Sequence, residues 1–401
     1  MINTKNSVSD FGLLGGAPLF RTPVSVGQMN SPSWEEFEST FRALFERQYY
    51  TNHGPLVQAF EQRLQDYLGV KHVVCVTNAT IGIIMAAEAV DIKGKVVVPS
   101  FTSISTVQAL TWAGLEPVFC DVDPETLHPT IQTIEPLINS EVSAILGVNL
   151  WGGSCSPLTL HNYAREHNLR IFFDSTHAMG CEYEDTLIGN FGDMEIFSFH
   201  GSEILGCGEG GCIATNDDHL AAKLRNIRSS YGAGAAVEVV KTSNGRMSEA
   251  QAALGILSLD KLSKNILRNE QSYLMYAENL DTISGLEILP PRNVSRSNYQ
   301  AIVCKVDESQ FGMNRDQLLQ VLLAENIFAR RDFYPGAHRS PPYNSLESNI
   351  SLNLPNTDSL TSSLIQLPVG SQLNEEHVAL ICRQIKTAHF FAFDICNKKG
   401  D

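Results

Sequence analysis

Seven short runs of apolar residues follow one another between residues 72 and 217. Each run is continuous rather than alternating, which is typical of strands that are buried on both faces of a sheet. Helical patterns lie between several of them, for example at residues 81–90 and 158–168. This alternation predicts an α/β domain with a mostly parallel sheet, whose ligands gather at the carboxyl ends of the strands. The predicted strands are residues 72–76, 95–100, 117–123, 144–152, 170–176, 194–200 and 211–217.

Two amphipathic helices are predicted before the first strand. The first covers residues 33–50, where Ser33 and Glu36 form a capping-box pattern and apolar residues recur on one helical face. The second covers residues 56–70, and we expect it to end at Gly69.

The pattern changes after the last predicted strand. Residues 247–280 form one long helical pattern, and mixed strand and helix signals follow it. We therefore expect a large α/β domain over residues 1–255 and a smaller α+β domain over residues 256–401. The polar, proline-containing stretch 339–360 is predicted to be a surface loop.

The charge balance narrows the range of partners. The 401 residues carry a formal net charge of −15, whereas nucleic acids and anionic membrane surfaces attract clustered Lys and Arg, so we expect neither as a partner. We find no apolar run of the kind that a signal peptide or a membrane span needs. The nine Cys are scattered without a C-x-x-C pair, which favours reduced thiols over a metal cluster. We expect a cytoplasmic protein without a metal.

A candidate phosphate site lies in the segment TNATIGI, residues 77–83, which follows the first predicted strand and opens a helix. Free backbone N–H groups of Ala79 and Thr80 at that helix N-terminus suit a phosphate group. The alternative is an ordinary helix cap by Thr77 or Asn78, which is the commoner use of such residues.

A candidate ring-binding site lies in FFDSTHAMG, residues 172–180, at the end of another predicted strand. The Asp174 carboxylate suits a positively charged ring nitrogen, and His177 suits a contact with the same ring. The alternative is a buried aspartate that caps the next turn.

Two further segments suit an anionic ligand. Asn244 and Arg246 precede a helix N-terminus, as a neutral donor and a cation. A loop at residues 328–343 combines cations with aromatic rings, which suits contacts with a diphosphate, a base or a sugar. The alternatives are a helix cap with a surface arginine, and a solvated basic loop. The side chains in question in this loop are Arg330, Arg331, Tyr334, His338 and Arg339.

These segments, in their order and spacing, resemble the DegT/DnrJ/EryC1/StrS sugar aminotransferases, which are fold-type I enzymes that use pyridoxal 5'-phosphate (PLP). The resemblance runs over essentially the whole chain. It implies a large domain with a mostly parallel seven-stranded sheet, a smaller C-terminal α+β domain, and a homodimer with a shared active site. The segments that carry it are NHGPLVQAFEQRLQDYLGV, TNATIGI, VVVPSFTSISTVQAL, PVFCDVDPETL, FFDSTHAMG, GDMEIFSFH, GEGGCIATND and NGRMSEAQAALG.

The resemblance also implies roles for single residues in binding the cofactor phosphate. Ala79 and Thr80 match the Gly-Thr pair whose backbone N–H groups hold that phosphate. Ser198 matches a hydroxyl on the same phosphate. Asn244 matches a side chain that reaches it from the other subunit.

The remaining implied roles concern the cofactor ring and the substrate. Asp174 matches the acid that keeps the pyridine nitrogen protonated, so that the ring can accept electrons. His177 matches a Gln/His position beside the ring oxygen. The segment ARRDFYPGAHRSPPY most resembles family members that act on dTDP-linked 4-keto-6-deoxyhexoses. The residues expected to bind such a nucleotide sugar are Arg246, Arg330, Tyr334 and His338.

One departure from the family pattern concerns the reaction itself. The family has S-F-H-x-T-K, and in this chain Ser198, Phe199 and His200 align with its start while Glu203 occupies the place of the lysine. That lysine binds the cofactor covalently and then moves a proton. A carboxyl group cannot form that bond and can only accept or donate a proton. We therefore expect Glu203 and His200 as catalytic candidates, with PLP or pyridoxamine 5'-phosphate (PMP) bound non-covalently.

Other departures also cluster at the cofactor positions. Ser103 stands where the family has an aromatic ring that stacks on the cofactor, which removes about 1 kcal/mol unless Phe101 substitutes for it. Gly245 stands where the family has Tyr or Phe, and the Gly-Thr pair has become Ala-Thr.

Three functions remain open from the sequence. The first is a PLP- or PMP-dependent aminotransferase that acts on a nucleotide-linked keto-deoxyhexose in amino-sugar or glycan biosynthesis. The second is a PMP-dependent lyase that dehydrates a keto sugar, with Glu203 as the base. The third is a non-catalytic homologue that binds a nucleotide sugar or a partner subunit.

Overall fold

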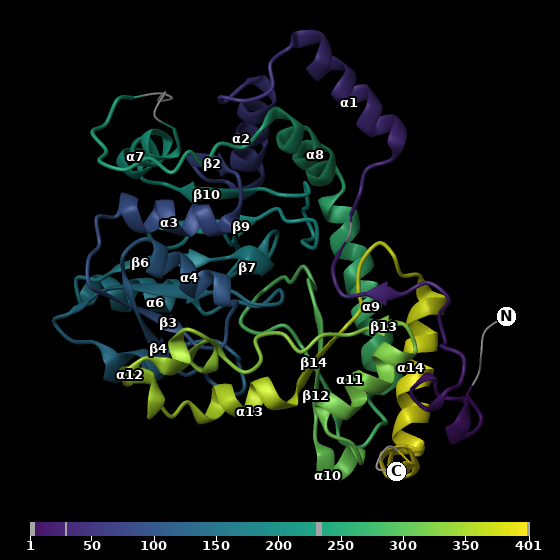
Figure 1. Cartoon of the computed structure of the whole chain (residues 1–401). Coiled ribbons are helices and arrows are strands. Elements are labelled where there is room, and N and C mark those ends of the chain that lie inside the picture. Colours follow the sequence, from purple (N-terminus) through teal and green to yellow (C-terminus); the bar gives the residue numbers. More distant parts are fainter. Residues whose placement is uncertain (1–4, 29, 230–234, 399–401) are drawn as a thin grey trace.

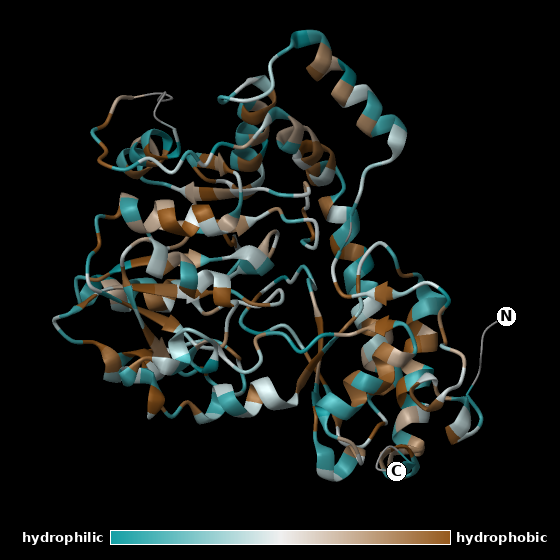
Figure 2. Ribbon diagram, viewed as in Figure 1, coloured by the Kyte–Doolittle hydropathy of each residue, from teal (hydrophilic) through white to brown (hydrophobic). Residues whose placement is uncertain are grey.

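The computed structural model describes residues 5–28, 30–229 and 235–398. Figure 1 shows a large α/β unit on one side and a smaller unit on the other, with helix α9 running between them. Figure 2 shows apolar residues along the strands and along the helix faces that cover them, while the outer faces of the helices are largely hydrophilic.

The large unit is built on one seven-stranded sheet, and all seven apolar runs predicted as strands contribute a strand to it. β10 is antiparallel to both neighbours and the other pairs are parallel, so the predicted mostly parallel sheet is confirmed. Across the sheet the strands are β2 (His72–Val76), β10 (Gly211–Thr215), β9 (Met194–Ser198), β6 (Arg170–Asp174), β5 (Val142–Val148), β3 (Lys95–Pro99) and β4 (Glu116–Cys120).

Both faces of this sheet are covered, which explains why the apolar runs do not alternate. In β2, Val74 and Val76 belong to one apolar cluster, whereas Val73 and Cys75 belong to another on the opposite face. The first face packs on α3 (Ala79–Ala89), α4 (Ile104–Trp112) and α7 (Asp218–Arg228), and the second on α2 (Pro55–Leu68), α6 (Pro157–Glu166) and α8 (Glu249–Asp260).

The two helices predicted before the first strand are present. α1 (Trp34–Arg47) begins with the predicted capping box of Ser33 and Glu36. α2 ends at Gly69, whose φ of 68° is the left-handed conformation that glycine adopts without strain. α1 projects from the rest of the molecule in Figure 1, and Leu44 is its one buried residue.

The prediction of one helix over residues 247–280 is wrong in one respect. The segment forms two helices, α8 and α9 (Leu262–Leu280), which meet at Lys261. α8 packs on α2, whereas α9 packs on α14 (Glu375–Phe390) of the smaller unit. Tertiary packing therefore breaks the helix at a point where no glycine or proline marks a break in the sequence.

The smaller unit contains an antiparallel three-stranded sheet of β11 (Leu286–Leu289), β12 (Ile302–Val306) and β14 (Leu364–Leu367). It is covered by α11 (Arg315–Ala324) and α14. Residues of the N-terminal segment join the same apolar cluster, and β1 (Val24–Ser25) pairs with β13 (Ile327–Phe328). The N-terminal segment thus packs with the smaller unit, whereas the division at residue 255 stays a prediction.

The stretch 339–360, predicted as a loop, is partly helical. It contains α12 (Glu347–Ile350) and most of α13 (Pro355–Ser363). The Asp121 carboxylate accepts hydrogen bonds from the N–H groups of Asn356 and Thr357 and so caps α13 from a different segment.

The other short elements of the described chain include single helical turns, labelled η, and a small hairpin. They are η1 (Val8–Asp10), η2 (Gly12–Leu14), α5 (Ile131–Ile134), η3 (Glu135–Leu137), η4 (Thr176–Ala178), β7 (Glu182–Tyr183), β8 (Thr186–Leu187), α10 (Glu308–Phe311), η5 (Ala337–Arg339), η6 (Tyr343–Ser345) and α15 (Ala392–Lys398). None of the helices within the described residues combines the length and hydrophobicity that a membrane crossing needs.

A buried ion pair joins three elements beside β2. The Glu61 carboxylate of α2 accepts hydrogen bonds from Arg228 Nη1 of α7 at 2.6 Å and from the Cys75 N–H of β2 at 2.8 Å. The Arg228 guanidinium also donates to the Cys75 carbonyl at 3.0 Å. Removing one member of such a pair leaves an uncompensated buried charge.

We therefore expect Arg228→Met to lower the free energy of unfolding by about 3 kcal/mol, because the buried Glu61 carboxylate would lose its arginine and keep only its hydrogen bond with His53 Nε2, at 2.7 Å, and that from the Cys75 N–H. Urea unfolding at pH 7 measures this loss. Arg225→Met is the matched control, since Arg225 lies on the same helix without being fully buried, and we expect less than about 1 kcal/mol. Equal losses in the two variants would contradict the assignment.

Candidate active site

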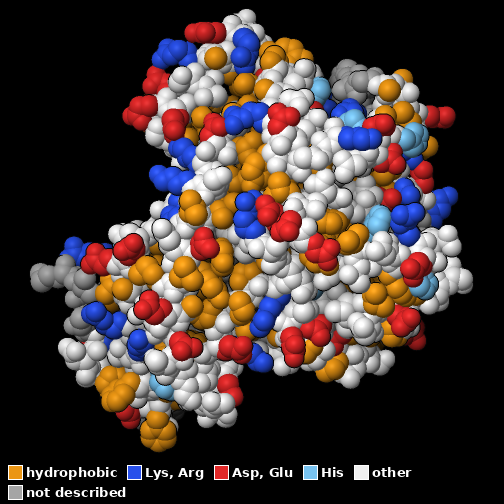
Figure 3. Space-filling view, turned by 180° about the vertical axis from the view of Figure 1, so that it is seen from behind, with side chains coloured by type: hydrophobic (Ala, Val, Ile, Leu, Met, Phe, Trp, Pro, Cys, Tyr) orange, Lys and Arg blue, Asp and Glu red, His pale blue; other side chains and the backbone are white. Residues whose placement is uncertain are grey.

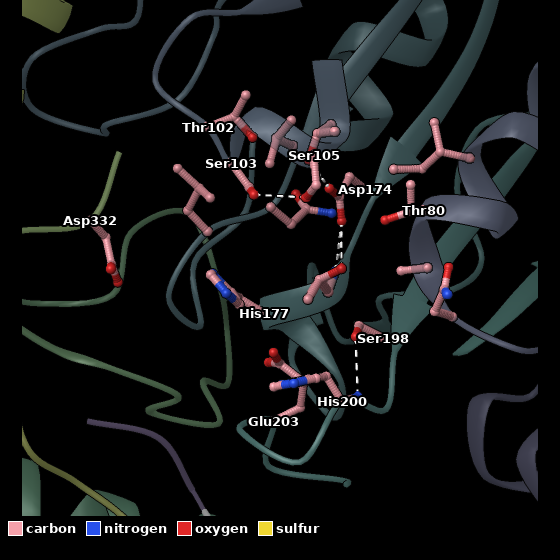
Figure 4. A pocket seen from close by; sticks show the side chains of 18 of the residues that line it. Thr80, Thr102, Ser103, Ser105, Asp174, His177, Ser198, His200, Glu203 and Asp332 are labelled. Carbon is pink, nitrogen blue, oxygen red and sulfur yellow. Dashed lines mark hydrogen bonds between the residues drawn. The ribbon is translucent and has the colours of Figure 1, made fainter. Parts of the chain in front are cut away.

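A cavity of about 470 Å³ opens at the carboxyl ends of the parallel strands, as the sequence predicts for a ligand site. It is closed on the other side by a loop of the smaller unit that carries Arg330 and Asp332 (Figure 4). Eight of the twelve predicted site residues line it, namely Ala79, Thr80, Asp174, His177, Ser198, His200, Glu203 and Arg330.

The N-terminus of α3 forms one end of this cavity. Asn78 caps the helix, because its side chain accepts a hydrogen bond from the Ile81 N–H at 2.9 Å. The N–H groups of the first turn, which include those of Ala79 and Thr80, have no partner within the helix. The helix cap and the candidate phosphate site therefore coexist at this terminus.

A glycine keeps this helix terminus accessible. A Cβ atom at Gly211 of β10 would lie 2.9 Å from the Ala79 nitrogen, which is closer than real Cβ contacts allow. Ser198, the cross-strand partner of Gly211, lines the same cavity with its hydroxyl. The arrangement suits an anionic group that accepts hydrogen bonds from backbone N–H and hydroxyl donors.

Asp174 ends β6 inside the cavity and is 7% exposed. Its two carboxylate oxygens accept hydrogen bonds from the hydroxyls of Thr106 at 2.7 Å and Thr176 at 2.6 Å. In the described part of the chain, no cationic side chain forms an ion pair with it. The Thr176 N–H also donates to it at 3.2 Å. A buried carboxylate whose partners are all neutral donors suits a ligand that brings a positive charge.

His177 lies beside Asp174 on the turn η4 (Figure 4). Its Nδ1 is buried and has no hydrogen-bond partner among the described residues. Burial lowers the pKa of the imidazole, against the opposing effect of the Asp174 charge, so the ring is neutral near pH 7. A neutral imidazole with an unpartnered nitrogen can exchange a hydrogen bond with a polar ligand atom.

Glu203 follows β9 and is 8% exposed at the wall of the cavity. Burial, and then the charges of Asp174 and Asp332, raise its pKa to about 8, although hydrogen bonds from Ser202 and Gln300 act in the opposite direction. The carboxyl group is therefore mostly protonated at pH 7. Burial thus raises the pKa of this glutamate toward the range in which it can act as a proton donor or acceptor near neutral pH.

The candidate aromatic substitute does not reach the cavity. Phe101 is fully buried and packs edge-on against Trp151 and Phe333, whereas the cavity is lined by Phe333 itself. The suggestion that Phe101 replaces the missing stacking ring at Ser103 is therefore wrong. Phe333 lies in the basic and aromatic loop 328–343, but its stacking on Trp151 arises only from the tertiary fold.

Four predicted residues lie outside this cavity in the single chain. Arg246 pairs with Val76 at the edge of the sheet, and Asn244 beside it is exposed. Tyr334 lines a neighbouring hollow instead. His338 is fully buried, with Nδ1 2.6 Å from the Ser100 hydroxyl, so its ring holds the loop against the large unit rather than facing the cavity.

Several cavity residues were not predicted from the sequence. Thr102 comes two residues after the predicted strand 95–100, and that position is the signal that could have identified it. Asn149 lies within the predicted strand 144–152 but directly follows the observed β5, and Thr106 lies on α4. Asp332 lies within the loop 328–343, where the cations and aromatic rings indicate an anionic ligand and give no indication that an acid also lines the site. Gln300, which donates to Glu203, carries no local signal at all.

The raised pKa of Glu203 makes stability depend on pH. The folded protein keeps this proton up to about pH 8, whereas the unfolded chain releases it near pH 4.5, so the stabilising contribution is lost as the pH rises through this window. Relative to Glu203→Gln, we expect the free energy of unfolding of the natural chain to fall by on the order of 3 kcal/mol between pH 5 and pH 8.

Urea unfolding at several pH values measures this difference. Glu209→Gln is the matched control, because Glu209 belongs to the same turn and its side chain is largely exposed. We expect its difference from the natural chain to stay constant over the same range. A constant difference for Glu203→Gln as well would show that Glu203 titrates as an ordinary exposed acid.

Comparisons with known proteins agree with this geometry. The model of the DegT/DnrJ/EryC1/StrS aminotransferase family matches residues 33–386. A dTDP-4-amino-4,6-dideoxy-D-glucose transaminase of Shigella dysenteriae is 32% identical over 368 residues, which cover 91% of this chain and 99% of that protein. The solved structure of DesI, determined in the presence of its TDP-sugar product, is 32% identical with a TM-score of 0.91, covering 98% of this chain and 100% of DesI.

A more distant structure shares the fold alone. NtdA of Bacillus subtilis, with bound PMP, is 20% identical with a TM-score of 0.80, over 89% of this chain and 82% of that one. These likenesses confirm the predicted fold of PLP-dependent aminotransferases. On the matched residues and the near-complete coverage, this chain belongs to the DegT/DnrJ/EryC1/StrS aminotransferase family.

Proposed function

We propose that this protein is a nucleotide-sugar aminotransferase that binds PLP or PMP without a covalent bond. Its substrate would be a nucleotide-linked keto-deoxyhexose, with a dTDP-linked 4-keto-6-deoxy sugar as the first candidate. The observation that carries the proposal is one cavity that combines an open helix N-terminus, the buried Asp174 carboxylate and the buried Glu203 carboxyl group.

The cavity offers complementary partners for each part of the cofactor. The backbone N–H groups of Ala79 and Thr80, with the Ser198 hydroxyl, would hold the phosphate. Asp174, which forms no ion pair with a cationic side chain of the described residues, would pair with the positively charged ring nitrogen. His177 would contact the ring oxygen. When bound, the cofactor supplies an electron-accepting ring and, as PMP, the amino group.

Glu203 would move the proton at the reacting carbon. A carboxyl group whose pKa lies near 8 is mostly protonated at pH 7 and keeps a minor ionised fraction, so it can donate a proton and, once ionised, accept one. It cannot replace the covalent bond that a lysine would form. Non-covalent binding therefore rests on the phosphate, ring-nitrogen and ring-oxygen contacts alone.

The substrate proposal rests on the loop of the smaller unit and on the relatives. Arg330 lines the cavity and suits a diphosphate. Arg246, Tyr334 and Asn244 lie outside the cavity of one chain, so they would contribute only if a second copy or a bound nucleotide extended the site. The shared homodimeric site and the cytoplasmic location stay predictions.

One observation favours a second candidate function. Because its pKa is raised to about 8, the ionised form of Glu203 is a stronger base than an ordinary carboxylate, which suits the removal of a proton from a keto sugar that then loses water. In that case the protein would be a PMP-dependent sugar dehydratase with the same bound groups. Incubation with PMP and a dTDP-4-keto-6-deoxyhexose separates the two, because mass spectrometry distinguishes an amino sugar from a sugar that has lost water. No product, together with no binding of PLP or PMP, would leave a non-catalytic homologue.

Asp174→Asn tests the cofactor site. We expect PMP to bind the variant roughly 10- to 100-fold more weakly than the natural chain, because a charge-assisted hydrogen bond to the ring nitrogen becomes a neutral one. Isothermal titration calorimetry measures the affinity. Asp332→Asn is the matched control, since this acid lies across the same cavity on the smaller unit, and its effect should be several-fold smaller.

Glu203→Lys tests whether the rest of the site still fits a lysine. We expect this variant, unlike the natural chain, to bind PLP covalently, because the new amine would extend into the cavity among the Asp174 and Asp332 carboxylates. A visible absorption band that disappears on borohydride reduction, while the reduced cofactor stays attached to the protein, would report the bond. Non-covalent binding of PLP to the variant would show that residue 203 does not face the cofactor.

A further inference from the structure

The side-chain amide of Gln300 fixes the orientation of the Glu203 carboxyl group. Its Oε1 accepts a hydrogen bond from the Ile204 N–H at 3.1 Å, so its Nε2 must point the other way. That Nε2 donates to Glu203 Oε2 at 2.7 Å. Gln300 is itself held, because its backbone carbonyl accepts from the buried Gln28 side chain at 3.0 Å.

This arrangement makes the two oxygens of Glu203 unequal. Oε2 receives an N–H donor and therefore acts as an acceptor, so the proton of the neutral carboxyl group resides on Oε1. Oε1 lies 3.2 Å from the Ser202 hydroxyl oxygen, which lies 2.8 Å from His200 Nδ1. Figure 4 shows His200 beside Glu203 at the cavity, and the His200 side chain is 55% exposed.

We propose that Ser202 conducts a proton between Glu203 and the solvent-exposed His200, and that Gln300 is a positioning residue that directs Glu203 Oε1 toward this path. The inference deepens the proposed function, because it explains how a buried acid at the lysine position could exchange its proton in each reaction cycle. The hydroxyl of Ser202 lies between the two titratable side chains.

The transfer balances without any further reactant. In one direction the Glu203 Oε1–H bond breaks as a Ser202 Oγ–H bond forms, while the former hydroxyl proton of Ser202 leaves to form the Nδ1–H bond of His200. The reverse sequence returns the proton. The net change is one proton that leaves Glu203 and one that arrives on His200, while Ser202 ends unchanged with its hydrogen bonds reversed.

The starting state of the path agrees with the hydrogen bonds around His200. The Ser202 N–H donates to His200 Nδ1 at 3.2 Å, which suits an unprotonated Nδ1 while Glu203 holds the proton. Ionised Glu203 accepts from the Ser202 hydroxyl instead, and this favours a proton on Nδ1. The other charged or titratable groups that face the two side chains are Asp174, His177, Glu209, Arg330 and Asp332.

The tautomer of His200 gives a direct test in the protein without cofactor or sugar. Imidazole 15N shifts, assigned with His200→Gln, would be followed between pH 6 and pH 10. We expect the proton of neutral His200 to move from Nε2 to Nδ1 as Glu203 ionises, with a midpoint near pH 8. Glu203→Gln should abolish this change, because it keeps the shape of the side chain and removes its titration.

Ser202→Ala tests the path itself. We expect the tautomer change at His200 to disappear while Glu203 still titrates, which carboxyl 13C shifts of labelled glutamate would report. Ser105→Ala is the matched control, because Ser105 lines the same cavity and its hydroxyl bonds to Ser103 rather than to Glu203. The tautomer change should persist in that variant with the same midpoint.

Gln300→Leu tests the positioning role. Loss of a donor to the charged carboxylate should raise the midpoint of the Glu203 titration by about one pH unit. Gln300→Met is a second variant of similar size that also removes the donor, to be used if the leucine variant does not fold. A midpoint unchanged in both would overturn the role of Gln300.

Two results would overturn the path. One is a His200 tautomer that stays constant in the natural chain while Glu203 titrates. The other is a tautomer change that survives Ser202→Ala, since it would then arise from the electric field of Glu203 alone. Because no cofactor or substrate is present, these outcomes are independent of PMP binding and product formation, which test the proposed function.

Discussion

The hydrogen-bond ladder of the parallel strands is the constraint on which the site depends. It pairs Val148 of β5 with Asp174 of β6, and Asp174 with Ile196 of β9, so these strands end at one edge of the sheet. Asp174 and Ser198 reach the same cavity for this reason. A slip of one residue in the ladder would turn every side chain of a strand to the opposite face and remove the acid from the cavity.

The same edge explains the unusual acid at residue 203. Two acidic side chains, Asp174 and Asp332, line the same cavity as Glu203, and burial raises the pKa of both Glu203 and Asp332. Glu203 therefore keeps its proton up to about pH 8. A carboxyl group whose pKa is raised by its surroundings is a device that many enzymes use to keep a proton donor in the site near neutral pH.

Much of the large unit could be predicted from the sequence because its information is local. The continuous apolar runs predict all seven strands, and the helix starts at Ser33 and Asn78 follow from side chains that bond to their own first turn. Eight residues of the cavity could likewise be predicted, because they match the family motifs or lie directly after strands that end at the same edge of the sheet.

The remaining features depend on contacts between distant segments, which a single sequence does not encode locally. Gln300 reaches Glu203 from about a hundred residues away, and Asp121 caps a helix that begins more than two hundred residues later. The basic neighbours of His338 in the sequence predict a ligand-binding residue. In the structure its ring instead bonds to Ser100, which lies in a distant part of the chain, and this contact cannot be read from the local sequence. The break at Lys261 likewise arises from the partners of α8 and α9.

The N-terminal apolar segment packs with residues that are synthesised about three hundred positions later, and this separation has a consequence for synthesis on the ribosome. Figure 3 shows apolar side chains gathered toward the middle of the back face, with charges of both signs around them. Val8, Phe11, Phe20 and Val24 find their neighbours only in the smaller unit, where Val24 pairs with Ile327. At about 5–20 residues per second, the ribosome needs roughly 15–60 s to make the chain between these two strands. During that time these apolar side chains are exposed outside the exit tunnel without their folding partners. A nascent-chain chaperone therefore has an apolar segment to bind and the time to bind it.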